Sequence, residues 1–430
     1  DTSKKPGMTS QVQELGFRNS MKQILTLRYF YFSPNLIWFL MALAMHLVFP
    51  YEIETAKLGW NLAWALRRLA LNMTVALSYY AFFYVGLFHL GWAHRKYAPH
   101  RYPTFGNMVH NIYYWSLGVL QWTAFECVVM RLWGTGKVPF VTNEQVLNDH
   151  HLLFKNILWV LLIPIWRDLH FYIAHRFIHI RAIYKFVHSL HHRNSDPEPF
   201  SGMTMHPVEH LYYFSNALIP TLYLEGLSPL IFLWCFVHLS IAPGAGHSGW
   251  EDHFQSDQYH YLHHAKFECN YGSPLSGFID QWCGTFREKL GDSTEYHGEY
   301  DNDTATVQKA DKTVWAKDSY LGTPADVWHG LYTVFWSALF PFAFWVIVGN
   351  TGPSKVSKVF GINLNEITAA MVAFGPIVVA ALLARLSGDR MHWRWPFHKE
   401  AVFGRFGVFV VSGYFACLLP VYHAVLWAAE

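Results

Sequence analysis

The sequence reads HFYIAH at residues 170–175, HSLHH at 188–192 and HYLHH at 260–264. Neutral imidazole is a common ligand for iron, zinc and copper. The three segments supply eight histidines, which is more than one metal ion needs. The pattern therefore predicts two metal ions held close together, with these ligands: His170, His175, His188, His191, His192, His260, His263 and His264.

The spacing within each segment suits a metal site on a helix. In the second and third segments the histidines fall at positions i, i+3 and i+4, which share one face of an α-helix. We therefore expect the three imidazoles of each segment to converge. His170 and His175 are five residues apart, about 140° around a helix, so they are predicted to flank a metal rather than stack.

The composition indicates a membrane protein. The chain has 430 residues, of which 52% are hydrophobic and only 14% charged, whereas soluble proteins average about 25% charged residues. The net charge of +2 gives no reason to expect nucleic-acid binding. The five cysteines are scattered without a C-x-x-C pair, so they are predicted to be reduced.

Apolar runs long enough to enter or cross a bilayer recur along the chain. They cover about residues 34–49, 69–92, 108–130, 157–170, 211–241, 328–348, 367–386 and 408–427. The run at 211–241 is interrupted near Glu225, so it is predicted to form two helices or a hairpin. Basic residues before the first run and after the second favour the cytosolic side, which places the histidine segments in the cytosol.

These features predict an all-α fold, a multi-span transmembrane helical bundle with a cytosolic, histidine-rich cap that holds two metals. Three regions are expected. Residues 1–150 form an N-terminal region with about three spans, residues 151–300 a histidine-box catalytic domain with membrane-embedded helices, and residues 301–430 a C-terminal region with about three spans.

The sequence resembles the fatty acid hydroxylase and sterol desaturase superfamily of membrane-bound non-haem di-iron enzymes. The family pattern is H-x(3,4)-H followed by two H-x(2,3)-H-H boxes, and all three occur here in order. Other family elements are resembled by RAIYK at 181–185, MHPVE at 205–209, HSGW at 247–250 and DQWCGTF at 280–286. The resemblance covers about residues 166–287. It is specific for the superfamily and does not specify the substrate.

The resemblance implies two bound iron ions, use of dioxygen, and oxidation of a lipid by hydroxylation, desaturation or epoxidation. Electrons would come from NAD(P)H through cytochrome b5 and its reductase, at the endoplasmic reticulum. The HSGW element favours a sterol or a sterol precursor. Candidates for further ligand positions are His206, His210 and His247, and candidates for orienting ligands are Asp168, Glu209 and Asp280.

Several alternatives stay open at the level of sequence. Within the superfamily, these are an alternative-type squalene epoxidase and a fatty acyl or ether-lipid hydroxylase. Outside it, a histidine-rich membrane metal transporter or sensor would place ionisable ligands near the membrane midplane, and a zinc hydrolase would need fewer ligands. Histidines with less regular spacing are more often ordinary structural residues: His179, His238 and His253.

Overall fold

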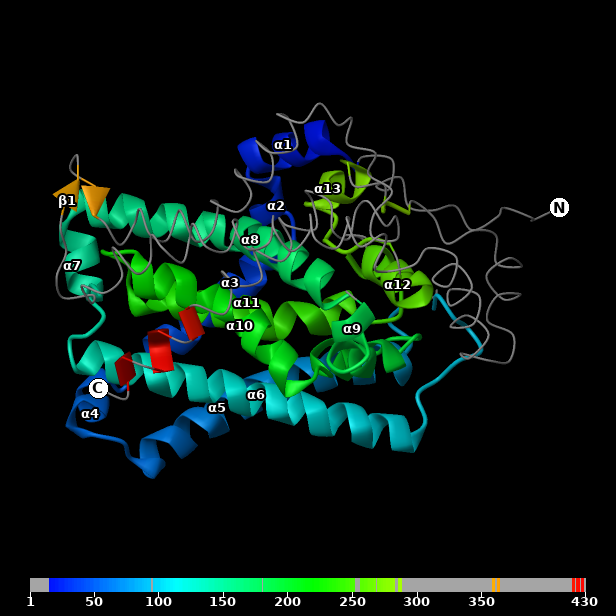
Figure 1. Cartoon of the computed structure of the whole chain (residues 1–430), viewed down its shortest axis with the longest axis horizontal. Helices are drawn as coiled ribbons and strands as arrows, with labels where there is room; N and C mark the ends of the chain where they lie inside the picture. The colour runs from blue at the N-terminus through cyan, green and yellow to red at the C-terminus, as the bar shows by residue number, and fades with distance from the viewer. Residues whose placement is uncertain are drawn as a thin grey trace, which may run out of the picture.

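The computed structural model describes residues 15–93, 96–179, 181–251, 256–267, 269–282 and 285–287, with short pieces at 358–359, 362–363, 420–421, 423–425 and 427–428. The described part is mostly helical, as predicted (Figure 1). Its paired strands are β1 (Lys358–Val359) and β2 (Ile362–Asn363), which are antiparallel. The apolar runs predicted at 328–348, 367–386 and 408–427 lie outside the described residues, except for the last short pieces.

Six long helices form the bundle: α3 (Pro34–Val48), α5 (Leu62–Phe88), α6 (Phe105–Gly134), α8 (His150–Ile178), α10 (Pro207–Tyr223) and α11 (Pro229–Gly246). Shorter elements connect or cover them: α1 (Phe17–Leu25), α2 (Arg28–Tyr31), α4 (Ile53–Leu58), α7 (Asn143–Asn148), α9 (Arg181–Tyr184), the 3₁₀ helices η2 (His188–Arg193) and η3 (Pro199–Met203), α12 (Ser256–Lys266) and α13 (Gly277–Trp282).

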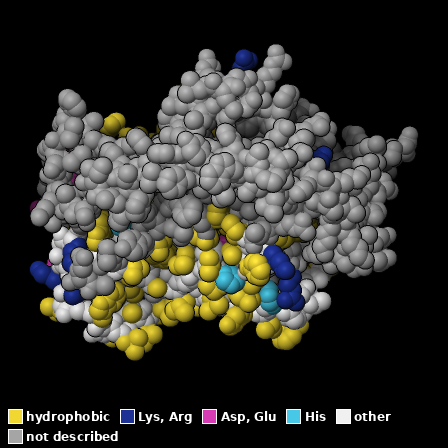
Figure 2. Space-filling model, in the orientation of Figure 1, with side chains coloured by type: hydrophobic (Ala, Val, Ile, Leu, Met, Phe, Trp, Pro, Cys, Tyr) yellow, Lys and Arg dark blue, Asp and Glu magenta, His cyan; other side chains and the backbone are white. Residues whose placement is uncertain are grey.

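Three of the helices in the described part of the chain are long and apolar enough to cross a membrane: α5, α8 and α11. Helix α3 is apolar but shorter, and α6 and α10 are helical where apolar runs were predicted but fall short in composition or length. Figure 2 shows a broad apolar surface between Lys and Arg side chains near its two ends. The multi-span prediction is thus confirmed, with fewer clear spans in the described residues than the sequence suggested.

Helix α11 is the centre of the bundle. In its apolar stretch 83% of the residues are buried, against 22% for α5. It packs against α3, α5, α8 and α10. The predicted break after α10 is confirmed, because α10 ends at Tyr223, Gly226 adopts a positive φ of 71° and Pro229 begins α11.

Helices α8, α10 and α11 each contain an internal proline, and these prolines explain how the three helices are joined. They are Pro164, Pro220 and Pro243, respectively. A proline has no N–H group, so the carbonyl four residues earlier loses its helical partner. Each freed carbonyl accepts a hydrogen bond from a side chain of another of these helices. Trp234 Nε1 of α11 donates to Val160 O of α8 at 3.0 Å, Trp166 Nε1 of α8 donates to Asn216 O of α10 at 3.0 Å, and Tyr213 OH of α10 donates to Leu239 O of α11 at 2.9 Å.

Replacing Trp234 by phenylalanine is therefore expected to lower the free energy of unfolding by about 1–3 kcal/mol, because the Val160 carbonyl would be buried without a partner. The measurement is thermal unfolding in detergent. Trp122→Phe is the matched control, since the Trp122 indole is equally buried and its Nε1 contacts no acceptor among the described residues. Equal destabilisation by both changes would contradict the carbonyl's role.

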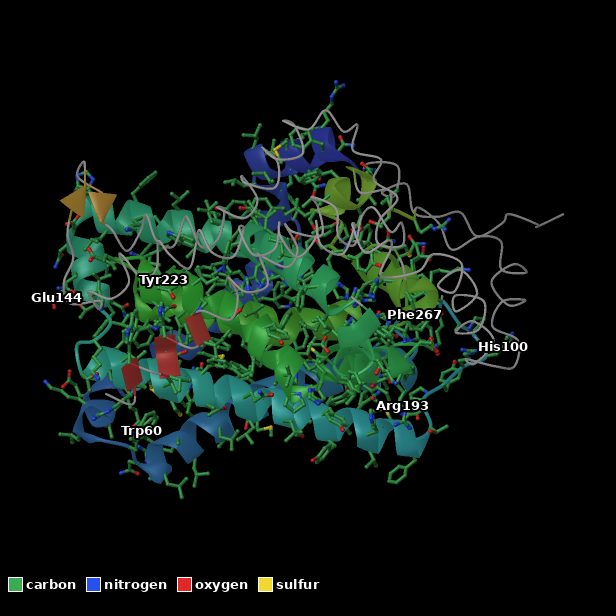
Figure 3. The ribbon with its side chains drawn as sticks, in the orientation of Figure 1. Trp60, His100, Glu144, Arg193, Tyr223 and Phe267 are labelled. Carbon is green, nitrogen blue, oxygen red and sulfur yellow. The ribbon has the colours of Figure 1, made fainter. Side chains whose placement is uncertain are left out.

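The alternating directions of the long helices bring the histidine segments to one end of the bundle (Figure 1). Figure 3 shows Arg193 and Phe267 at this end and Trp60 and Glu144 at the opposite end. A close backbone approach completes this end: a Cβ atom on Gly202 of η3 would lie 2.5 Å from the Pro243 carbonyl oxygen of α11. Only glycine fits there without displacement of one element.

Candidate metal centre

Five buried histidines form a first cluster, called cluster 1: His175, His179, His188, His192 and His263. They come from the end of α8, from η2 and from α12, and one ring nitrogen of each lies within 4.8 Å of those of the others. The Nε2 atoms of His192 and His263 are 3.0 Å apart, and those of His175 and His188 are 3.1 Å apart. Two ligands at right angles around an ion, each at about 2.1 Å, would be about 3 Å apart, so these nitrogens suit a common metal.

Four buried histidines form a second cluster, called cluster 2: His191, His247, His260 and His264. They come from η2, from the residue that ends α11, and from α12. The Nε2 atom of His247 lies 2.9 Å from that of His260, 3.1 Å from that of His264 and 3.3 Å from that of His191. The clusters adjoin, since the ring centroids of His192 and His264 are 4.8 Å apart.

Each H-x-x-H-H box contributes to both clusters. In η2, His188 and His192 belong to cluster 1 and His191 to cluster 2, and in α12 His263 belongs to cluster 1 while His260 and His264 belong to cluster 2. The expectation that three imidazoles of one box converge is therefore wrong. Adjacent residues of a helix point about 100° apart, so the neighbouring histidines of each box diverge.

In four of the nine clustered histidines, the second ring nitrogen is held by a backbone carbonyl. The Nδ1 atoms of His175, His247 and His263 donate to the carbonyls of Tyr271, Pro243 and Cys269 at 2.7–2.8 Å. The Nδ1 atom of His191 lies 3.2 Å from the Thr204 carbonyl oxygen. Because a carbonyl only accepts, each Nδ1 carries the proton and each Nε2 keeps a lone pair for a metal.

The clustered imidazoles are poor bases in this environment. Burial lowers the pKa of His191 to about 4 and the pKa of His263 to about 3. Burial, with the neighbouring histidines, also lowers the pKa values of His188 and His192 well below the ordinary value. These rings are neutral at pH 7, which is the form that binds metals.

Among the described residues, Glu209 is a carboxylic acid that contacts a cluster directly. His188 Nδ1 lies 2.7 Å from Glu209 Oε1, so Glu209 orients a ring as the sequence predicted. Burial raises the pKa of Glu209 well above its ordinary value. A positive charge nearby is thus needed to keep it ionised, and a cation at His188 Nε2 would supply one.

The other two acids predicted to orient ligands lie farther out. Asp168 pairs with Arg167 at 3.1 Å and accepts from Ser273 Oγ. Asp280 accepts from Tyr271 N at 3.1 Å and from Tyr259 OH at 2.7 Å. Asp280 therefore fixes the loop whose Tyr271 carbonyl holds His175, one step removed from the ring itself.

A cavity of about 330 Å³ opens beside both clusters. Its walls include two histidines of cluster 1 and three of cluster 2, together with aromatic side chains: His175, His188, His191, His247, His260, Trp38, Phe171 and Tyr213. It extends to the N-terminal segment, where Lys22 and Arg28 line it. The cavity therefore connects both clusters with the N-terminal segment of the described chain.

Comparison with known proteins shows which family the segment with the two clusters is similar to. Residues 160–285 match the model of the fatty acid hydroxylase family. A delta(7)-sterol 5(6)-desaturase of Gibberella zeae is 30% identical over 37% of this chain and 53% of its own length. Methylsterol monooxygenase 1 of Danio rerio is 29% identical over 24% of this chain and 39% of its own length. Lathosterol oxidase of Rattus norvegicus is 31% identical over 28% of this chain and 42% of its own length.

The chain is thus similar, over this segment, to the fatty acid hydroxylase family, and its relatives include sterol desaturases and a methylsterol monooxygenase. It spans about half or less of the length of these curated relatives. No solved structure matches it. The segment that the family model matches is the one that carries the clusters.

The superfamily pattern and the structure together correct the choice of the first box. His170 lies outside both clusters, and its Nε2 is 3.0 Å from Ser215 Oγ. His175 and His179 satisfy H-x(3)-H and lie on one helix face, which is the signal that the choice of His170 overlooked. The expectation that His179 is an ordinary structural residue is not what the structure shows, because its Nε2 is 3.2 Å from those of His192 and His263.

Of the three histidines predicted as further ligands, His206, His210 and His247, the structure places one in a cluster and two outside. His247 is a central member of cluster 2. His206 caps α10, where its Nδ1 accepts from Val208 N at 3.2 Å, and His210 lies 2.9 Å from Gln121 Oε1. Neither His206 nor His210 belongs to a cluster, because the ring of each is held by other contacts at the start of α10.

Proposed function

We propose that this protein is a membrane-bound, di-iron, dioxygen-dependent oxidoreductase that acts on a lipid, and that the lipid is a sterol or a sterol precursor. The observation that carries the proposal is the pair of adjacent, buried, all-histidine clusters at one end of a membrane bundle, both open to one cavity. The names of the sterol-oxidising relatives support the substrate class.

The residues present fit two metal ions. Nine neutral imidazoles offer soft-to-intermediate nitrogen donors that suit iron, zinc or copper. Iron is favoured because oxidation of an unactivated carbon needs a redox-active group that side chains cannot supply. Bound iron would supply the activation of dioxygen and the removal of hydrogen from carbon.

The chain's own residues have distinct proposed roles. The five histidines of cluster 1 and the four of cluster 2 hold one ion each, in place of a set containing His170, His206 or His210. Backbone carbonyls and Glu209 hold the rings in the ligating orientation. The cavity holds the lipid beside the clusters.

The remaining parts of the proposal concern partners and location. Electrons come from NAD(P)H through cytochrome b5 and its reductase, and the clusters face the cytosol at the endoplasmic reticulum. The reaction is hydroxylation, desaturation or epoxidation of one position. A metal transporter or sensor is the competing class, and it is disfavoured because the ligands gather at one end of the described helices rather than midway along them.

Replacing Glu209 by glutamine is expected to weaken metal binding by about 10–100-fold, because the uncharged amide no longer stabilises His188 as a ligand. Iron retained after dialysis against a chelator is the measurement. Glu198→Gln is the matched control, since Glu198 is as buried but bonds Asn111 and the Phe200 N–H instead of a histidine. Equal iron loss from both variants would mean that either substitution destabilises the fold in general, and it would contradict a specific role of Glu209.

The function is tested by lipid profiling of the chain in yeast strains that each lack one step: squalene epoxidation, C4-demethylation, C5-desaturation or fatty acyl hydroxylation. Rescue of one strain, lost in His192→Ala, is expected and would name the substrate and reaction together. Metal analysis of the purified chain is expected to find two irons per chain. Bound zinc without any oxygen-dependent product would overturn the proposal in favour of a sensor or transporter.

A further inference from the structure

We propose that Lys96 is a positioning residue for cluster 2: its ammonium group holds in place the chain segments that carry the histidines of this cluster. The premise, taken from the proposed function, is that both clusters bind metal ions. Lys96 belongs to the connection between α5 and α6, in which residues 96–98 are called the strap. Figure 3 shows His100, two residues beyond the strap, at the same end of the bundle as Phe267.

The Lys96 ammonium group is buried and fully hydrogen-bonded. Its side chain is 2% exposed and that of its partner Asp196 is 13% exposed. Nζ donates to the two carboxylate oxygens of Asp196 at 3.0 and 2.8 Å and to the Ala98 carbonyl at 3.1 Å. An ammonium group has three donors, so all of them are used. Nζ also lies 5.9 and 5.6 Å from the ring centroids of Phe88 and Tyr102, which stabilise the positive charge.

The backbone of the strap pairs with the loop that carries His247. Lys96 and Trp250 form an antiparallel bridge, and the Tyr97 N–H donates to the Gly249 carbonyl at 3.1 Å. His247 lies two residues before Gly249. The strap therefore limits how far the His247 ring can move from the other ligands of cluster 2.

The segment that carries His191 is held against the same loop. Asp196, the acceptor of the ion pair, lies five residues after His191. The next residue, Pro197, approaches Gly249 so closely that a Cβ atom on Gly249 would lie 2.4 Å from the Pro197 carbonyl oxygen. The ion pair and this close approach together hold His191 beside His247, and the Nε2 atoms of these two rings are 3.3 Å apart.

Helix α12, which carries the other two histidines of cluster 2, packs against the strap. The ring centroids of Tyr97 and Tyr261 are 4.8 Å apart. Both rings belong to a small hydrophobic cluster that also contains Ala265. In the sequence, Tyr261 and Ala265 directly follow the ligands His260 and His264. The strap and its ion pair thus join all three segments that supply ligands to cluster 2.

Removal of the ammonium group should affect the two metal sites unequally. The Asp196 carboxylate would lose its partner and turn toward water, and the segments of cluster 2 would shift with it. A metal site tolerates a displacement of its ligands of only about 0.2 Å. Cluster 1 is less affected, because His175 and His188 are held by the Tyr271 carbonyl and by Glu209, which lie outside the segments joined by the strap.

The test is equilibrium dialysis of the purified full chain, stripped of metal, against graded concentrations of free Co²⁺ in detergent. The wild-type protein is expected to bind one Co²⁺ ion at each cluster. Lys96→Met should bind one ion with unchanged affinity and the other about 10–100-fold more weakly, the range for loss of a group that orients ligands. Asp196→Asn keeps the shape of the partner, removes its charge, and should weaken the same ion.

His247→Ala identifies which ion is weakened. It removes a ligand of cluster 2, so one tightly bound Co²⁺ should remain, at cluster 1. Adding Lys96→Met to His247→Ala should not weaken that ion further, whereas general destabilisation of the fold would. Lys137→Met is the matched control, because Lys137 Nζ donates to the Trp427 carbonyl at 2.8 Å. Lys137 lies between α6 and α7, at the end of the bundle opposite the clusters, so both ions should stay tightly bound.

Four outcomes overturn the role of Lys96: unchanged binding of both ions in Lys96→Met, equal weakening of both, the same weakening in Lys137→Met, or fewer than two ions in the wild type. Co²⁺ binding needs neither iron nor turnover. A chain whose second ion depends on Lys96 but that oxidises no lipid contradicts the proposed function alone. An active chain whose second ion is independent of Lys96 contradicts the positioning role alone.

Discussion

Replacing His179 by alanine is expected to lower iron content and abolish lipid oxidation, whereas replacing His170 by alanine should leave both irons in place. The two histidines lie on the same helix, α8, and both are buried. His179 Nε2 lies 3.2 Å from the Nε2 atoms of His192 and His263, while His170 contacts Ser215. Loss of a ligand should lower the affinity of cluster 1 for iron by more than about 100-fold. That factor is the upper end of the range for loss of a group that only orients a ligand.

The measurement is iron per chain by elemental analysis of purified protein, with turnover measured alongside. His179→Gln is a second variant, which fills the volume of the histidine side chain and retains its polarity. If the iron loss in His179→Ala came from misfolding alone, His179→Gln should keep its iron. Iron loss in His170→Ala with full iron in His179→Ala would restore the assignment that local spacing suggested and reject the clusters described above.

The largest expected effect on stability comes from Glu126 of α6. Its carboxylate is fully buried and pairs with Arg68 of α5 at 2.7 and 2.9 Å. It also accepts from Tyr51 OH at 2.7 Å and from Asn72 Nδ2 at 2.6 Å. Glu126→Ala would leave the Arg68 guanidinium buried without its partner, and this is expected to cost about 3–5 kcal/mol.

Thermal unfolding in detergent measures this effect, with two comparisons built into the chain. The double change Arg68→Met with Glu126→Met removes both charges and should recover most of the loss, because no unpaired charge remains. Arg67→Ala, one residue away, breaks an exposed pair with Glu52 and should change stability little. Similar losses from Glu126→Ala and Arg67→Ala would contradict the dominant role of burial.

Local pattern was enough to predict much of the fold. The apolar runs lie on α3, α5, α6, α8, α10 and α11, and the break near Glu225 separates α10 from α11, because hydrophobic length and the glycine and proline signals act over a few residues. Side-chain bonds to the carbonyls freed by Pro164, Pro220 and Pro243 could not be foreseen, since each joins helices distant in sequence.

The sequence by itself determined that this protein combines apolar helices with a histidine-rich segment, and it led to the prediction of two metals there. Only the tertiary structure decided which imidazoles meet. Neighbouring histidines such as His191 and His192 separate into different clusters, and His179 and His247 join them while His170 does not. The physical reason is that a metal site is defined by where nitrogen atoms from α8, η2, α11 and α12 converge in space. Spacing within one segment fixes only the direction of each ring relative to its own helix.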